Sequence, residues 1–221
     1  MKKLGILHKK HIFFIGIGGI SMSGLAKLVL DSGTKISGSD TGCGKEIEIL
    51  ESLGITIYHN HSGDNISSDI DLVVFTGAIL PNNPEIVRSK ELGIELMERS
   101  EFLGLVSQNY DKVIAIAGTH GKTTTTALIG EIFVGAGLNP TIHLGGESIS
   151  LKGNTIIGGN EYFIVEACEY RESFSYLQPD IGVVTNIDLD HIDYYKNFQE
   201  IHNAFERFSR NCKKSVTTKR I

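Results

Sequence analysis

Short apolar runs alternate with segments of helical periodicity through the first half of the chain. The apolar positions predict strands over residues 11–15, 35–37, 70–75 and 94–96. The segments between them predict helices over residues 20–30, 45–53, 84–92 and 100–106, the last with Ser100 as its N-cap. Alternation of strands and helices is typical of βαβ units, whose strands run parallel.

A polar break at residues 107–111 precedes a second pattern of the same kind. It predicts strands over residues 113–117, 162–165 and 181–185, and helices over 122–134 and 198–208. The glycine-rich stretch between Leu138 and Asn160 predicts irregular structure. We therefore expect an α/β fold with a boundary near Gln108. A Rossmann-like parallel-sheet domain would span residues 1–108, and a partial P-loop-type α/β domain residues 109–221.

Composition and charge narrow the class of protein. The 221 residues are 41% hydrophobic and 21% charged, and their formal net charge is −5. An acidic chain lacks the basic face that nucleic acids require, so we expect no nucleic-acid partner. No apolar stretch reaches the ~20 residues of a membrane helix, so we expect no membrane partner.

Cysteine usage and the first residues bear on location. Cys43, Cys168 and Cys212 are widely spaced and form neither a disulfide framework nor a zinc pattern, which fits a reducing cytosol. Lysines precede an apolar run at residues 12–17 and give a superficial likeness to an export signal, but glycines interrupt the run. We therefore expect a cytoplasmic protein.

A glycine-rich loop joins the first predicted strand to the first helix. Its sequence is Gly16-Ile17-Gly18-Gly19-Ile20-Ser21-Met22-Ser23-Gly24. Glycines there let backbone amides approach a pyrophosphate at the helix N-terminus. The dinucleotide fingerprint needs glycine where this chain has Ser21, and Asp40 follows the next strand, where an acid can bond a ribose hydroxyl. The loop therefore indicates a diphosphate without separating a nicotinamide dinucleotide from a UDP-sugar, and the alternative is a tight turn without ligand.

A second phosphate-binding signature follows the strand predicted at residues 113–117. The segment reads Ala117-Gly118-Thr119-His120-Gly121-Lys122-Thr123-Thr124-Thr125-Thr126. Gly121, Lys122 and Thr123 match the end of the P-loop pattern, in which the lysine neutralises phosphates and the hydroxyl holds magnesium. The alternative is a chance match at a helix start, but the strand and helix that the motif requires are both predicted.

Two features of this segment leave questions open. Ile116 stands where the usual pattern opens with glycine, so Gly118 opens a variant loop. His120 either shapes the loop or faces a second substrate, since loop residues beside a phosphate site often do one or the other.

Acidic residues and a histidine follow two later strands. Glu166 and Glu169 come after the strand at residues 162–165, and His191 ends the polar segment after the strand at residues 181–185. The carboxyl ends of parallel strands share one sheet edge, so these residues are expected beside the phosphate loop. Magnesium prefers oxygen ligands, which favours Glu166. A histidine ligand is unusual for magnesium, so chemistry alone does not favour His191, and the alternatives for it are an N-cap or a hydrogen-bonded loop histidine.

Together these segments resemble the Mur ligase family. The resemblance rests on residues 16–24, 37–40, 77–79, 83–85, 118–126, 145–146, 166–169 and 185–193, and runs from about His11 to Phe208. The phosphate loop is typical of the whole family, and the first glycine loop points to the member that uses L-alanine.

The resemblance implies roles for particular residues. The first domain would hold the UDP part of a substrate and the second would hold ATP. Substrate positions are Gly18, Gly19, Ser21, Met22, Ser23, Asp40 and His120. ATP positions are Gly118, Thr119, His120, Gly121, Lys122, Thr123 and Thr124. Magnesium positions are Thr123, Glu166 and His191, and the catalytic positions are Lys122, Glu166 and His191.

The resemblance also implies a reaction. ATP phosphorylates the lactyl carboxylate of UDP-N-acetylmuramate, and the amine of L-alanine attacks the acyl phosphate, as a step of peptidoglycan synthesis. Cys168 departs from an acid common in the family. Family members continue for a further section and a third domain. We therefore expect a fragment that does not ligate by itself, with an unpaired apolar sheet edge after residues 181–185.

Three alternatives remain at this stage. The first is a ligase that recycles murein peptides, whose first loop usually differs. The second is a nucleotide-binding module without catalysis. The third is a dinucleotide-dependent dehydrogenase, which has no use for the γ-phosphate site that the second loop indicates.

Overall fold

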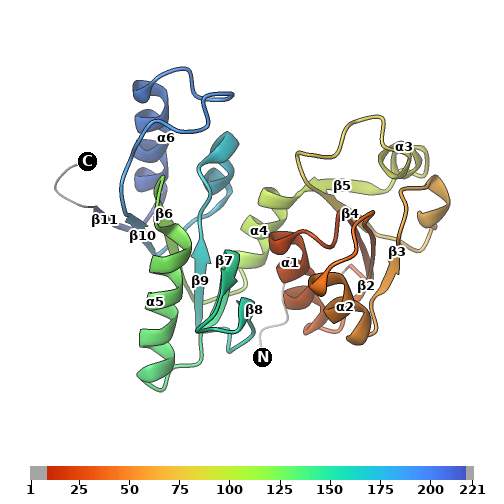
Figure 1. Cartoon of the computed structure of the whole chain (residues 1–221), viewed down its shortest axis with the longest axis horizontal. Coiled ribbons are helices and arrows are strands. Elements are labelled where there is room, and N and C mark those ends of the chain that lie inside the picture. The colour runs from red at the N-terminus through yellow and green to blue at the C-terminus, as the bar shows by residue number, and fades with distance from the viewer. Residues whose placement is uncertain (1–8, 218–221) are drawn as a thin grey trace. The chain divides into compact units, whose positions relative to one another are not determined.

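The computed structural model describes residues 9–217 (Figure 1). The chain divides into two compact units, with the division in sequence between Phe102 and Leu103. Helix α4 (Arg99–Ser107) contains this division, and the boundary expected near Gln108 stays a prediction. Each unit contains its own sheet.

The first unit is a parallel α/β sheet with helical connections. Its strands are β1 (His11–Ile15), β2 (Lys35–Ser39), β3 (Thr56–Tyr58), β4 (Leu72–Phe75) and β5 (Glu95–Glu98). Its helices are α1 (Ile20–Leu30), α2 (Lys45–Ser52), the 3-10 turn η1 (Gly63–Asn65) and α3 (Pro84–Glu91). All pairs are parallel and the strand order is β3-β2-β1-β4-β5. The chain order reverses at β1, and ligands of such folds bind at the carboxyl edge of this switch point.

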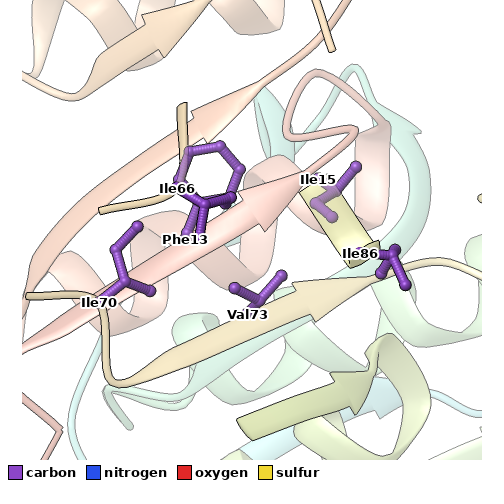
Figure 2. Close-up of a cluster of buried hydrophobic side chains, with 6 residues drawn as sticks. All are labelled: Phe13, Ile15, Ile66, Ile70, Val73 and Ile86. Atoms are coloured by element: carbon purple, nitrogen blue, oxygen red, sulfur yellow. The ribbon is translucent and has the colours of Figure 1, made fainter. Parts of the chain in front are cut away.

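A cluster of buried apolar side chains packs on one face of this sheet. Phe13 and Ile15 of β1 share one face because strand side chains alternate, and Val73 of the neighbouring β4 lies beside them. Figure 2 shows these side chains gathered with Ile70 and Ile86, all of them buried. Because this cluster is closely packed, β1 is held firmly in place, and the first glycine loop follows it.

The second unit contains a mixed sheet of order β11-β10-β6-β9-β7-β8. Its strands are β6 (Lys112–Ala117), β7 (Thr141–Ser148), β8 (Gly153–Ile156), β9 (Tyr162–Glu166), β10 (Ile181–Val184) and β11 (Lys214–Thr217). Its helices are α5 (Lys122–Gly135), the 3-10 segment η2 (Tyr170–Tyr176) and α6 (Phe198–Asn211). Only β7 and β8 pair antiparallel. The carboxyl ends of β6, β9 and β10 therefore share one edge, as expected for the phosphate loop and the later acids.

The α/β class and most elements confirm the sequence-based expectation, but four details were wrong. Strand β3 was missed, and the glycine-rich stretch expected to be irregular forms β7 and β8. The helix after β5 begins at Arg99, and both the N–H and the hydroxyl of Ser100 donate to the Glu98 carboxylate, so Ser100 is not its N-cap. Strand β10 is paired on its outer side with β11, so the predicted bare edge there is wrong.

The reason for the last error is the composition of β11. Its four residues contain one apolar side chain, Val216, and all four are exposed, so neither alternation nor burial was readable from the sequence. Within the part of the chain that the structure describes, no helix is long and apolar enough to cross a membrane.

Candidate active site

The loop between β6 and α5 has the backbone that its glycines predict. Gly118 has a φ of +140° and Gly121 a φ of +79°, a region that residues with a side chain rarely adopt. A Cβ on Gly118 would clash with Thr185 Oγ1, whereas Gly121 has open space around it. Gly118 thus allows the loop to approach the segment after β10.

That segment holds the loop through hydrogen bonds. The N–H of His120 donates to Asn186 Oδ1 at 2.9 Å, and Asn186 Nδ2 donates to the His120 carbonyl at 2.9 Å. The N–H of Asp188 donates to Thr119 Oγ1 at 2.9 Å. The phosphate loop is therefore braced by the polar segment that the sequence placed beside it.

The side chain of Lys122 is folded back toward the loop. Its Nζ donates to the carbonyls of Gly118 at 2.7 Å and Thr119 at 3.2 Å. The same Nζ lies 2.9 Å from Glu169 Oε2 in an ion pair whose side chains are 14% and 0% exposed. Lys122 is therefore a fixed cation at the mouth of the loop.

Thr123 at the start of α5 and Glu166 at the end of β9 bring two oxygen-bearing side chains together. Thr123 Oγ1 donates to Glu166 Oε2 at 2.8 Å, and the N–H of Gly145 donates to the same oxygen at 2.8 Å. A Cβ on Gly145 would lie 2.8 Å from Glu166 Oε1, so this strand needs glycine to admit the carboxylate. The glycines that obscured β7 in the sequence therefore make room for the acid.

A cavity of about 370 Å³ opens over this loop. Its lining consists of Thr119, His120, Gly121, Lys122, Thr123, Thr124 and Glu166. Six of the seven residues expected to contact ATP line it together with the expected metal-binding acid, while Gly118 shapes the loop behind it. Backbone amides, a lysine and hydroxyls around one cavity make a site for a phosphate chain.

His191 contacts Glu169, the same acid that pairs with Lys122. Its Nε2 is 3.3 Å from Glu169 Oε1, and its backbone φ is +53°, an uncommon conformation that often marks functional positions. Tyr170 packs against the ring with centroids 4.8 Å apart and donates its hydroxyl to Asp193 at 2.7 Å. Lys122 and His191 thus both contact the buried carboxylate of Glu169.

Glu169, which the sequence predicts beside the phosphate loop without indicating a role for it, is a further residue of this site. It is fully buried and contacts both Lys122 and His191, while its carbonyl accepts the Tyr195 hydroxyl at 2.6 Å. Burial raises the pKa of Tyr195 far above its usual value, so that hydroxyl stays protonated and keeps donating. The sequence signal was present as an acid three residues after Glu166, but its partners come from distant segments.

Replacing Glu169 by glutamine is expected to destabilise the second unit by about 3 kcal/mol, because the Lys122 ammonium loses its buried counter-charge. Urea unfolding followed by tyrosine near-UV circular dichroism measures this, since the chain has no tryptophan. Glu206→Gln is the control, because that acid pairs with Arg210 at the surface and contributes little. A shift no larger than the control's would contradict the assigned importance of the pair.

The donors at this cavity fit a magnesium ion. Thr123 Oγ1 and the Glu166 carboxylate supply hard oxygens, and magnesium usually takes one or two protein oxygens and completes its shell with water and substrate phosphates. Among residues 9–217 no group of three or more His, Cys, Asp or Glu side chains is arranged as a metal cage. His191 faces Glu169, and its role as a metal ligand stays a prediction.

In the first unit, the glycine loop is held by Asp40. Its Oδ2 accepts the N–H of Gly18 at 2.8 Å, and its Oδ1 accepts the N–H of Gly42 at 2.8 Å. A Cβ on Gly18 would lie 2.9 Å from Asp40 Oδ2 and from Ile47. Gly19 is exposed at the N-terminus of α1. Asp40 therefore orders the loop in this state, and its contact with a ribose stays a prediction.

The remaining candidates on α1 differ in exposure. Ser21 is half-buried and accepts a hydrogen bond from Arg99 Nη1 at 3.2 Å. Met22 is 1% exposed and lies in the core, and Ser23 is 0% exposed, with its hydroxyl donating to Glu46 Oε2 at 2.9 Å. Met22 and Ser23 support the helix behind the loop, and their contact with substrate stays a prediction.

Comparisons with known proteins agree with this arrangement. The model for the Mur ligase family, catalytic domain, matches residues 11–111, and the model for the Mur ligase middle domain matches residues 116–218. UDP-N-acetylmuramate–L-alanine ligase from Acetivibrio thermocellus is 49% identical over 95% of this chain and 45% of its own length. The enzyme of that name from Clostridium kluyveri is 50% identical over 92% of this chain and 45% of its own length.

Solved structures give the same result. UDP-N-acetylmuramate-alanine ligase from Thermotoga maritima superposes with a TM-score of 0.87 at 37% identity, over 95% of this chain and 49% of that one. UDP-N-acetylmuramate:L-alanyl-gamma-D-glutamyl-meso-diaminopimelate ligase from Neisseria meningitides superposes with a TM-score of 0.86 at 26% identity. The match covers 96% of this chain and 72% of that chain. The chain thus spans less than half the length of the curated relatives described above. The two family models together match the chain from β1 to its last described residues, and the chain therefore belongs to the Mur ligase family.

Proposed function

We propose that the complete protein carrying this sequence is an ATP-dependent ligase that joins L-alanine to the lactyl carboxylate of UDP-N-acetylmuramate in peptidoglycan synthesis. The observation that carries the proposal is the cavity at the phosphate loop, where Lys122, Thr123 and Glu166 converge. The 49% identity to a ligase of that name supports the choice of substrates. The three free cysteines fit an enzyme of the reducing cytoplasm.

The proposed chemistry has two steps. The lactyl carboxylate attacks the γ-phosphorus of ATP, and the bond to the β-phosphate oxygen breaks, which gives an acyl phosphate and ADP. The amine of L-alanine then attacks the acyl carbon, phosphate leaves with the bonding electrons, and the amine loses a proton. A carboxylate is a poor electrophile and an acyl phosphate is a good one, so the first step makes the second possible.

The chain's own residues provide for the first step. Lys122 neutralises charge between two anions that must approach each other, and the loop amides orient the phosphate chain. Magnesium, held by Thr123 and Glu166, would shield the phosphate oxygens. His120 is 68% exposed at the cavity mouth, where it is placed to meet the second substrate, and Glu169 keeps Lys122 and His191 in position.

The first unit is expected to bind UDP and to bind NAD at least ten-fold more weakly, because Ser21 stands where the dinucleotide fingerprint requires its third glycine. Calorimetric titration of the chain with each ligand measures this. Equal or tighter binding of NAD would replace the UDP-sugar assignment by a dinucleotide site.

The ligase activity itself is tested on the complete protein. Purified protein, free of host ligase, receives UDP-N-acetylmuramate, ATP and magnesium with L-alanine, with the murein tripeptide or with no amine. The proposal expects phosphate release and a product whose mass increases by one alanyl residue only with L-alanine. Faster reaction with the tripeptide would favour the recycling ligase, and ATP binding without turnover would favour a non-catalytic module.

A further inference from the structure

Arg99 places a guanidinium beside the first glycine loop. The residue opens α4 at the carboxyl end of β5, and its Nη1 donates to Ser21 Oγ at 3.2 Å. Ser21 is the second residue of α1, two residues after Gly19. Both partners belong to the same compact unit, so the contact is internal to the first unit.

The charge of Arg99 is left without an acidic partner among residues 9–217. Arg99 is half-buried, and its Nη1 contacts the neutral Ser21 hydroxyl. The adjacent acid, Glu98, is directed to the N–H and hydroxyl of Ser100. A half-buried cation without a counter-ion costs free energy, and an anionic ligand would remove that cost.

Lys27 is a cation near this loop that is already neutralised. Lys27 Nζ lies 2.6 Å from Glu46 Oε2, and both side chains are largely buried. Burial alone would raise the pKa of Glu46, but hydrogen bonds from Lys27 and Ser23 hold it below its usual value, so this carboxylate stays ionised. Unlike Lys27, Arg99 is therefore available to an anionic ligand at this loop.

A cation at this loop would offset the negative charge of Asp40 when a diphosphate binds. The N–H of Gly18 is taken by Asp40, which also adds negative charge next to the loop. The N-terminus of α1 has no side-chain cap and no acid in its first turn, so its dipole favours an anion. A guanidinium bonded to Ser21 through one nitrogen keeps further N–H groups for phosphate oxygens.

From these contacts we propose that Arg99 binds the diphosphate of the nucleotide-linked substrate in the first unit. The inference rests on the proposed function, because that function supplies the UDP-linked ligand. It names a residue that lies outside both glycine motifs. Arg99 acts in binding, since the phosphoryl and acyl transfers are assigned to the second unit.

The test compares UDP with uridine, which lacks phosphates. Arg99→Gln is expected to weaken UDP binding about 10- to 100-fold in calorimetry, since hydrogen bonds to charged groups are lost. Uridine binding, followed by ligand-observed NMR, is expected to stay unchanged. Arg99→Lys should lie between wild type and Arg99→Gln, because it keeps the charge and loses the planar fork. Arg88→Gln is the matched control, because Arg88 pairs with Glu91 at the surface of the same unit.

Each outcome decides a different point. Wild-type UDP affinity in Arg99→Gln would overturn the inference and leave the proposed function standing. Equal losses of UDP and uridine binding would also overturn it, because they would show that Arg99 supports the fold of the unit and not the phosphates. Failure of the folded wild-type chain to bind UDP would instead overturn the substrate assignment on which the inference rests.

Discussion

Replacing Lys122 by methionine is expected to lower ligation turnover of the complete enzyme about a thousand-fold. The ammonium is held at the mouth of the phosphate cavity by Gly118 O, Thr119 O and Glu169. It is thus placed to neutralise charge where the carboxylate and the γ-phosphate approach. Methionine has a similar length and fills the space without the charge, so the effect isolates electrostatics from packing.

The measurement is L-alanine-dependent phosphate release with saturating substrates, together with calorimetric ATP binding. Lys213→Met is the control, because Lys213 is exposed and pairs with Asp180 away from the cavity. Near-normal turnover in Lys122→Met would mean that the phosphate loop is not where transfer takes place. A loss shared by the Lys213 variant would indicate a general effect of removing charge.

Gly118→Ala is expected to destabilise the second unit by about 3 kcal/mol or more and to abolish ATP binding. The backbone φ of +140° is open only to glycine, and the added methyl would clash with Thr185 Oγ1. That hydroxyl donates to the His120 carbonyl at 2.8 Å, so displacing it also loosens the loop. Strain and a lost brace therefore act together.

Gly121→Ala separates these contributions. Gly121 also has positive φ, at +79°, but nothing lies within 4 Å of an added Cβ. Its expected destabilisation is about 1 kcal/mol, from backbone conformation alone. Urea unfolding of both variants, followed by tyrosine near-UV circular dichroism, gives the comparison. Equal effects of the two substitutions would contradict the proposed clash with Thr185.

Strongly periodic elements were predictable from the sequence because local pattern determined them. The runs that form β1 and β6 are apolar and end at glycine loops, and α1 begins after such a loop, so strand, turn and helix signals agree. Strand β7 was hidden because Gly145 and Gly146 interrupt its apolar pattern, although Gly145 is needed for contact with Glu166. The space that the Glu166 carboxylate occupies thus requires glycine where an apolar residue would have revealed the strand.

The residues of the phosphate loop were predictable from the sequence, whereas the residues that contact and position them were less so. Lys122, Thr123 and Glu166 follow from motif and strand position, and the structure places all three at one cavity. The pairing of Glu169 with Lys122 and the contact of Arg99 with Ser21 could not be found in the same way. Each residue acts through a partner far away in sequence, Lys122 for Glu169 and Ser21 for Arg99, and one sequence does not reveal such pairs.

In the reaction proposed for the complete protein, the first step is activation of the lactyl carboxylate by phosphorylation. It is tested most directly with UDP-N-acetylmuramate labelled with ¹⁸O in both oxygens of that carboxylate. Attack by the carboxylate and later departure of phosphate transfer one labelled oxygen to each phosphate released. We expect phosphate that carries one ¹⁸O for each amide bond formed, detected by ³¹P NMR or mass spectrometry. Ligation that releases unlabelled phosphate would contradict it.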